Sequence, residues 1–131
     1  MEIKYNKTKP LDYAKLMLRC GGRRISARTI TDSINRSLLT VGLFDGDELV
    51  AFGRIVGDGC IYFILCDIMV APDYRDMGCE QQVFKEMNDF ILEFASAGSR
   101  IYVLADRPFD ESYLKFGYTY LDPDSMAVLE K

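Results

Sequence analysis

The hydrophobic period of the chain changes at a proline near its middle, and this change limits the folds that the chain can adopt. Residues 60–70 are apolar on both faces, as in a strand that is covered on both sides of a sheet. Beyond Pro72, apolar residues recur at helical spacing, which predicts an amphipathic helix over residues 80–97. Residues 101–105 have the pattern of a further strand. This order predicts a β-α-β unit with parallel strands and a right-handed crossover.

The residues before this unit predict two short helices and a hairpin. Pro10 suits the first turn of a helix, and Ile30 and Ile34 stand one helical turn apart. The turn sequence Asp45-Gly46-Asp47 separates two β-rich stretches. Together with residues 60–70, these stretches predict a three-strand antiparallel meander. The predicted elements are helices over residues 11–19 and 26–36 and strands over residues 38–44 and 49–56.

The residues after the β-α-β unit predict a short helical turn over 111–115, ended by Gly117, and a final β segment over 118–129. A length of 131 residues and a mass of 14.9 kDa allow one domain, which we expect to span residues 1–131. The whole pattern predicts an α+β layered fold. It has a mixed, mostly antiparallel central sheet with helices on both faces.

The composition excludes several common kinds of site. The chain has no histidine, so a histidine-dependent triad or a histidine-rich metal site is impossible. No two of its four cysteines have the two-residue spacing of a zinc knuckle or a thioredoxin-like motif, and we expect no metal. Lys plus Arg total 16 and Asp plus Glu total 20, which gives a net charge of -4. This balance argues against nucleic acid or an anionic membrane as a partner and tolerates a cationic small molecule.

No stretch has the apolar run of a signal peptide or of a membrane-spanning helix. We therefore expect a cytoplasmic protein with reduced thiols.

Residues 67–81 are the stretch with the clearest chemical signal. A strand that ends in a short loop opening a helix presents unpaired backbone N–H groups and the positive end of the helix dipole, which suit a phosphate or pyrophosphate. Gly78 and Arg75 lie in this predicted loop. In the alternative interpretation, Gly78 only relieves a tight turn and Arg75 is solvated.

Two motifs resemble those of one enzyme family. Arg75-x-x-Gly78-x-Glu80 is similar to the acyl-CoA signature of the GNAT superfamily of N-acetyltransferases, Arg/Gln-x-x-Gly-x-Gly/Ala. The run Tyr113-Leu114-Lys115-Phe116-Gly117-Tyr118 resembles the late Tyr-x-Lys-Phe-Gly-Phe motif of that family, and residues 43–54 resemble its central hairpin. The motifs occur in the family's order, and the likeness covers residues 38–118.

The resemblance implies the acyl-CoA N-acyltransferase fold and an acetyltransferase that uses acetyl-CoA as co-substrate. We expect it to transfer acetyl to the primary amine of a small molecule by direct attack. The alternative is a catalytically silent member of the fold that senses CoA or binds a protein. The resemblance also allows a homodimer.

The resemblance also implies which residues hold the donor. Strand backbone at Ile68, Met69 and Val70 would contact the pantetheine arm. Main-chain N–H groups of the loop and the first helical turn would surround the pyrophosphate, and these residues are Arg75, Asp76, Met77, Gly78, Cys79, Glu80 and Gln81.

Glu80 departs from the family pattern, which has Gly or Ala at this position. A carboxylate that points into the site would repel a pyrophosphate. A carboxylate that turns outward would instead favour the helix dipole.

Two residues are candidates for the chemistry of transfer. Asp67 interrupts the apolar row of the central strand, so it is either a base, acting directly or through water, or a structural carboxylate that bonds loop amides. By resemblance, Tyr113 would protonate the departing CoA thiolate, and its alternative role is packing.

Other polar residues carry weaker signals. Cys79 at a helix start is either reactive or a small packing residue, and packing is the interpretation we adopt. Asp106 and Glu111 either line the acceptor side or only solubilise a loop. A basic cluster either holds an acidic group of a ligand or forms a solvated face, and its members are Arg19, Arg23, Arg24 and Arg28.

Overall fold

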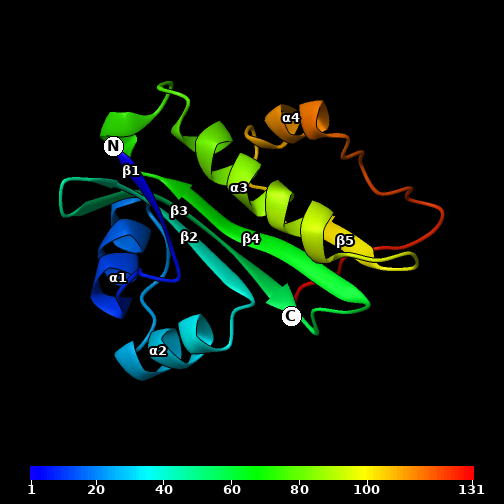
Figure 1. Ribbon diagram of the computed structural model, residues 1–131, viewed down its shortest axis with the longest axis horizontal. Coiled ribbons are helices and arrows are strands. Elements are labelled where there is room, and N and C mark those ends of the chain that lie inside the picture. Colours follow the sequence, from blue (N-terminus) through cyan, green and yellow to red (C-terminus); the bar gives the residue numbers. More distant parts are fainter.

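A computed structural model describes residues 1–131 of the chain (Figure 1). Five strands and four α-helices follow one another along it, with two short 3-10 turns at Pro72–Tyr74 and Leu114–Phe116. The order is β1 (Glu2–Tyr5), α1 (Pro10–Arg19), α2 (Ala27–Asn35), β2 (Leu39–Asp45), β3 (Glu48–Gly57), β4 (Tyr62–Val70), α3 (Cys79–Phe94), β5 (Arg100–Val103) and α4 (Asp110–Tyr113).

The five strands form one open sheet in the order β1-β2-β3-β4-β5. The pairs β1–β2, β2–β3 and β3–β4 are antiparallel, whereas β4 and β5 run parallel and are connected through α3. The predicted mixed, mostly antiparallel sheet is therefore confirmed, as are the meander and the parallel pair.

Helices cover both faces of this sheet and enclose two separate cores (Figure 1). On one face, α3 packs its apolar side, including Val83, Phe84 and Met87, against the sheet. On the other face, Tyr13 and Leu16 of α1 and Ile30 of α2 pack against a second set of sheet residues. The prediction of helices on both faces is confirmed.

Gly53 sets the distance between α3 and the sheet. A Cβ at this position would stand 2.5 Å from the Met87 sulfur and 3.0 Å from a methyl group of Val83. The absence of a side chain on β3 therefore lets the helix lie directly on the strand.

One expectation about the elements is wrong and one element was missed, and both lie near the ends of the chain. Residues 118–129 form no strand, and from Thr119 onward every residue is exposed. Asp122-Pro123-Asp124 interrupts the run, and Pro123 has no N–H to donate to a ladder. Conversely, β1 was not anticipated, because four residues are too few for an alternating pattern to stand out from a loop.

None of the helices combines the length and the apolarity that a membrane crossing requires.

Candidate active site

Strands β4 and β5 separate halfway along β4. Their parallel pairing runs from Tyr62 opposite Arg100 to Leu65 opposite Val103, and the Leu104 N–H donates to the Leu65 carbonyl at 2.9 Å. Strand β5 ends there, while β4 continues to Val70 with β3 on its other side. From Cys66 to Val70, the edge of β4 that faces the gap has no partner strand, so peptide groups along it are available to a ligand. The Val70 carbonyl already accepts a hydrogen bond from the Cys20 thiol at 3.3 Å.

A bulge marks the point where the strands separate. Cys66 lies opposite Arg54 and Met69 opposite Phe52, so two residues of β4, Asp67 and Ile68, face Gly53 alone. Asp67 has a φ of 54°, in the left-handed region that non-glycine residues rarely adopt. The bulge turns the Asp67 side chain toward the face of the sheet that α1 and α2 cover.

The loop after β4 delivers free N–H groups to the gap. Asp76 and Gly78 have φ values of 63° and 77°, and Gly78 is the N-cap of α3. The first backbone bond of the helix runs from the Gln82 N–H to the Gly78 carbonyl, so the N–H groups at the start of α3 have no helical acceptor. A helix of 16 residues also places the positive end of its dipole here.

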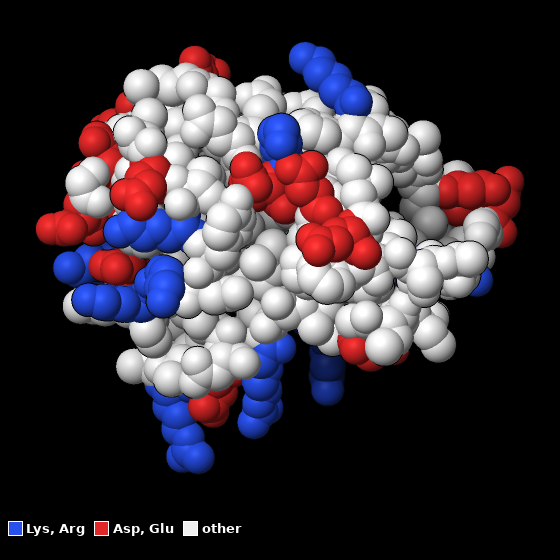
Figure 2. All heavy atoms as spheres, in the orientation of Figure 1, with Lys and Arg blue, Asp and Glu red and all other residues white.

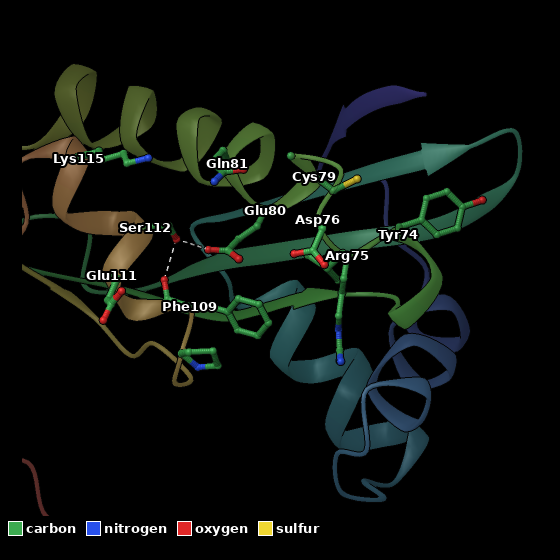
Figure 3. Close-up of a pocket in the computed structure, with 13 residues that line it drawn as sticks. Tyr74, Arg75, Asp76, Cys79, Glu80, Gln81, Phe109, Glu111, Ser112 and Lys115 are labelled. Atoms are coloured by element: carbon green, nitrogen blue, oxygen red, sulfur yellow. Dashed lines mark hydrogen bonds between the residues drawn. The ribbon is translucent and has the colours of Figure 1, made fainter.

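A cavity of about 450 Å³ lies between this loop, the first turn of α3 and the segment around α4 (Figure 3). Its charged lining residues are Arg75, Lys115, Asp76, Glu80 and Glu111. Three carboxylates therefore face two cations. Figure 3 shows the Arg75 side chain directed away from Glu80.

Glu80 lies across the cavity rather than out in solvent. Its Oε1 accepts a hydrogen bond from the Ser112 hydroxyl at 2.5 Å, which joins the first turn of α3 to α4 (Figure 3). The Ser112 oxygen also lies 2.7 Å from the Phe109 carbonyl. Of the two orientations considered from the sequence, Glu80 adopts the one that directs the carboxylate into the site.

Tyr113 is buried next to this contact. Its ring stacks on Phe84 at a centroid distance of 4.2 Å. Burial and the neighbouring Glu80 carboxylate raise the pKa of the Tyr113 phenol above its usual range. The ring does not line the 450 Å³ cavity but a smaller one of about 200 Å³ beside it, which Val103 and Tyr118 share.

Asp67 is held by two side chains that the sequence analysis did not single out. Its Oδ2 accepts hydrogen bonds from the Tyr13 hydroxyl at 2.9 Å and from the Arg54 Nε at 2.7 Å. Burial and Asp67 together raise the pKa of Tyr13, whereas for Arg54 the carboxylate outweighs burial and raises the pKa. Asp67 Oδ1 makes no hydrogen bond within the chain.

The two networks lie on opposite faces of the sheet. Glu80, Ser112 and Tyr113 gather on the α3 side, whereas Asp67, Tyr13 and Arg54 gather on the side of α1. The gap between β4 and β5 lies between them. A signal for the second network existed in the sequence, because Arg54 is the one charged residue within the apolar stretch 49–56 and needs a partner there.

The remaining predicted donor residues differ in exposure. Met69 packs in the core under α1, and Val70 packs in the core under α3. Ile68 is partly buried against the core under α3. Met77 is exposed, and Gln81 borders the cavity. Cys79 is fully buried, and burial raises the pKa of its thiol, which favours packing over reactivity.

The candidates with weaker signals differ in whether they line the cavity and whether they make ion pairs. Glu111 lines the cavity, whereas Asp106 does not. Arg19 pairs with Glu48 and Asp73. The other three arginines of the basic cluster make no ion pair.

The fold is closely similar to several solved structures. A protein of unknown function from meticillin-resistant Staphylococcus aureus, described as a probable acetyltransferase, superposes with a TM-score of 0.90 at 27% identity, over 99% of this chain and 98% of that one. A GNAT-family acetyltransferase from Streptococcus pneumoniae superposes with a TM-score of 0.79 at 21% identity, over 99% and 96% of the chains.

A third similar structure contains a ligand. It is an aminoglycoside 6'-N-acetyltransferase complexed with coenzyme A, with a TM-score of 0.64 at 17% identity, over 79% of this chain and 61% of that one. No family model matches the sequence, and no curated protein matches it either. Over nearly its whole length, the chain has the acyl-CoA N-acyltransferase fold of the GNAT acetyltransferases.

Proposed function

We propose that the chain is an acetyl-CoA-dependent N-acetyltransferase that acetylates the primary amine of a small molecule by direct transfer. The observation that carries the proposal is the unpaired edge of β4 from Cys66 to Val70, which leads into a helix N-terminus with free N–H groups. An extended arm can bond such an edge as a further strand would, and a pyrophosphate suits the loop beyond it.

The backbone along the end of β4 and the following loop fits acetyl-CoA as the donor. A Cβ at Gly78 would meet only a Gln81 oxygen at 3.8 Å, so open space lies in front of the loop. The pantetheine arm would lie along Ile68, Met69 and Val70, and residues 75–81 would hold the pyrophosphate. The carboxylates of Asp76, Glu80 and Glu111 oppose the charge of the pyrophosphate, and the bond from Ser112 holds that of Glu80 across the cavity.

The side chains divide the proton transfers between the two faces of the sheet. Acetyl-CoA, when bound, supplies the acetyl group as a thioester. An alkylammonium with a pKa near 10.4 needs about 4 to 5 kcal/mol to lose its proton at pH 7. Asp67 is the carboxylate that would bind that ammonium and accept the proton, directly or through water. Tyr113 is the acid proposed for the departing thiolate.

A melting experiment tests the proposal. At 100 times its dissociation constant, acetyl-CoA should stabilise the fold by ~2.7 kcal/mol, which raises the melting temperature by several degrees. Free adenine nucleotides are the control, since they lack the pantetheine arm. Thiol release from acetyl-CoA upon addition of primary amines then tests transfer. No rise with acetyl-CoA at any concentration would contradict the proposal.

A second candidate function rests on the acidic lining of the cavity. Glu80 joins α3 to α4, and the carboxylates at this site outnumber the cations. A silent module that senses CoA weakly or binds a protein would keep such a contact. Stabilisation by acetyl-CoA without thiol release for any amine would favour this candidate.

A further inference from the structure

A third cavity lies on the face of the sheet opposite α3. Helices α1 and α2 cover this face (Figure 1). The volume of the cavity is about 160 Å³. Its apolar lining residues are Ile25, Ile30 and Ile34, and the sheet contributes Arg54 and Asp67. The polar lining residues are Tyr13, Arg23, Thr29, Ser33, Arg54 and Asp67. The cavity therefore adjoins the bulge at which β4 and β5 separate.

Asp67 lines this cavity, and its Oδ1 makes no hydrogen bond within the chain. Tyr13 and Arg54 both donate to Oδ2, so they fix the carboxylate without occupying Oδ1. Arg54 is itself bonded to the Ser33 carbonyl and the Ser37 hydroxyl, at 3.4 and 3.3 Å, and so cannot swing into the cavity freely. Asp67 Oδ1 is thus a fixed acceptor for an ammonium group.

The charges around the cavity do not balance. Arg23 and Arg54 are positive and Asp67 is negative, and Arg54 is paired with Asp67. Arg23 has no carboxylate partner. Figure 2 shows other basic side chains projecting from the lower edge of the molecule, where α2 and the loop before it lie. An acceptor that carries only positive charge would meet one unpaired cation here, whereas an anionic group would be attracted.

The volume limits the acceptor further. A cavity of this size holds about five water molecules, if each takes ~30 Å³. The head group of an α-amino acid has an ammonium nitrogen, one carbon and a carboxylate, and is of this size.

We propose that the acceptor is a small zwitterion, an α-amino acid or a close analogue, with its ammonium on Asp67 and its carboxylate on Arg23. This inference rests on the proposed acetyltransferase function and names its substrate class. In the reaction, the amine nitrogen forms a bond to the acetyl carbon and the carbon–sulfur bond breaks. The ammonium loses two protons, one before attack and one as the amide forms. The thiolate takes up one proton and leaves as a thiol, so one proton is released overall.

Three matched acceptors test the substrate class by thiol release from acetyl-CoA. Alanine carries both charges, alaninamide lacks the carboxylate, and 1,4-diaminobutane carries two positive charges. We expect kcat/KM for alanine to exceed that for either of the others by at least about tenfold, as for the loss of one charge-assisted contact. Preference for alaninamide or the diamine would overturn the proposal.

A pair of variants tests the role of Arg23. Arg23→Gln should remove the preference for alanine over alaninamide, because the carboxylate loses its partner. Arg36→Gln is the matched control, since Arg36 is exposed at the end of α2 and does not line the cavity. Equal preference in wild type and Arg23→Gln would overturn the assignment.

Binding without acetyl-CoA separates this proposal from the proposed function. Saturating alanine should raise the melting temperature of the wild type by about 2 °C or more and leave that of Arg23→Gln unchanged. A rise with alanine but none with acetyl-CoA would retain the zwitterion site and reject the acetyltransferase. A rise with acetyl-CoA but none with alanine would reject the zwitterion site alone.

Discussion

Glu80 is the residue at which the charge of the site and the geometry of the fold conflict. Its backbone belongs to the helix turn that should attract a pyrophosphate, yet its carboxylate lies in the same cavity and bonds Ser112. A phosphate group entering the cavity would either displace this carboxylate or approach it closely.

Replacing Glu80 separates its charge from its bulk. Glu80→Gly removes both, and Glu80→Gln removes the charge alone. We expect Glu80→Gly to raise the affinity for CoA about tenfold to a thousandfold, because a like-charge contact of ~1 to 4 kcal/mol is lost. Titration calorimetry measures the affinity for CoA, and Glu80→Gln should retain most of the gain in affinity. Ser112→Ala is the control that removes the hydrogen bond and keeps the carboxylate. Unchanged affinity in both Glu80 variants would show that the carboxylate moves aside without cost.

Tyr113 makes two contributions that one substitution separates. Its ring packs on Phe84, while its hydroxyl is the proposed acid. Tyr113→Phe should therefore leave the melting temperature nearly unchanged and lower kcat by about 10²-fold, the usual contribution of a general acid. Steady-state kinetics with acetyl-CoA and a reactive amine measures it.

The matched control for Tyr113 is Tyr118→Phe. The ring of Tyr118 also contacts Phe84, at a centroid distance of 5.4 Å, and its hydroxyl bonds Asn88. The Tyr118→Phe variant should keep the kcat of the wild type. An equal kcat in wild type and Tyr113→Phe would assign the Tyr113 hydroxyl to packing alone.

At the level of residues, the sequence could identify Asp67 and Tyr113, and Arg54 carried a signal, but Tyr13 and Ser112 could not be identified. Asp67 stood out because it interrupts an apolar row, and Tyr113 because of a motif. Tyr13 and Ser112 carry no such mark, since they are 54 and 32 positions from the residues they bond. Contacts of this range depend on how helices pack on the sheet, which the local pattern does not encode.

Among the elements, the start of α3 combines a strained backbone with the proposed phosphate site. Gly78→Ala should cost about 1 to 2 kcal/mol of folding free energy, because an alanine disfavours a φ of 77°. If the loop holds the pyrophosphate, the same variant should also weaken CoA binding, by about tenfold or more for ~1.4 kcal/mol of misplacement. Chemical unfolding and calorimetry measure the two effects.

Gly98→Ala is the control for this element. Gly98 has a φ of 89° and no atom within 4 Å of an added Cβ, but it lies beyond the other end of α3. It should show the folding cost without the loss of affinity. Equal affinity in the two variants would place the pyrophosphate elsewhere.

The elements themselves were predictable where a period ran long enough. Helix α3 and strand β4 have 16 and 9 residues, and the sequence located both within three residues at each end. Residues 118–129 form no strand, because Asp122-Pro123-Asp124 divides the apolar residues into two runs too short to pair. The four-residue β1 was found only through its pairing with β2.

At the scale of the molecule, both cores contain ionisable groups that are buried in their neutral form. Burial is the main cause that raises the pKa of the Cys66 thiol to about 11 and that of the Tyr118 phenol to about 12. Burial also raises the pKa of Tyr13, in the core under α1, and of Tyr113, in the core under α3. In each case the folded state retains a proton that the unfolded chain gives up at lower pH.

The fold should therefore lose stability in alkaline solution. A raised pKa contributes stability that is fully present below the pKa of the unfolded chain, near 9 for cysteine and 10 for tyrosine, and that is lost as pH rises toward the folded value. We expect the free energy of unfolding to be steady from pH 7 to about 8.5 and to fall by about 2 kcal/mol or more between pH 9 and 12. Urea unfolding followed by circular dichroism at each pH measures this.

Two variants assign the loss to particular groups. Cys66→Ala and Tyr118→Phe each remove one titrating group, so each should make the decline shallower even where it lowers stability at pH 7. Tyr62→Phe is the control, since the Tyr62 side chain is exposed and belongs to neither core. A decline of equal slope in Cys66→Ala, Tyr118→Phe and wild type would mean that alkaline unfolding begins at exposed groups, outside both cores.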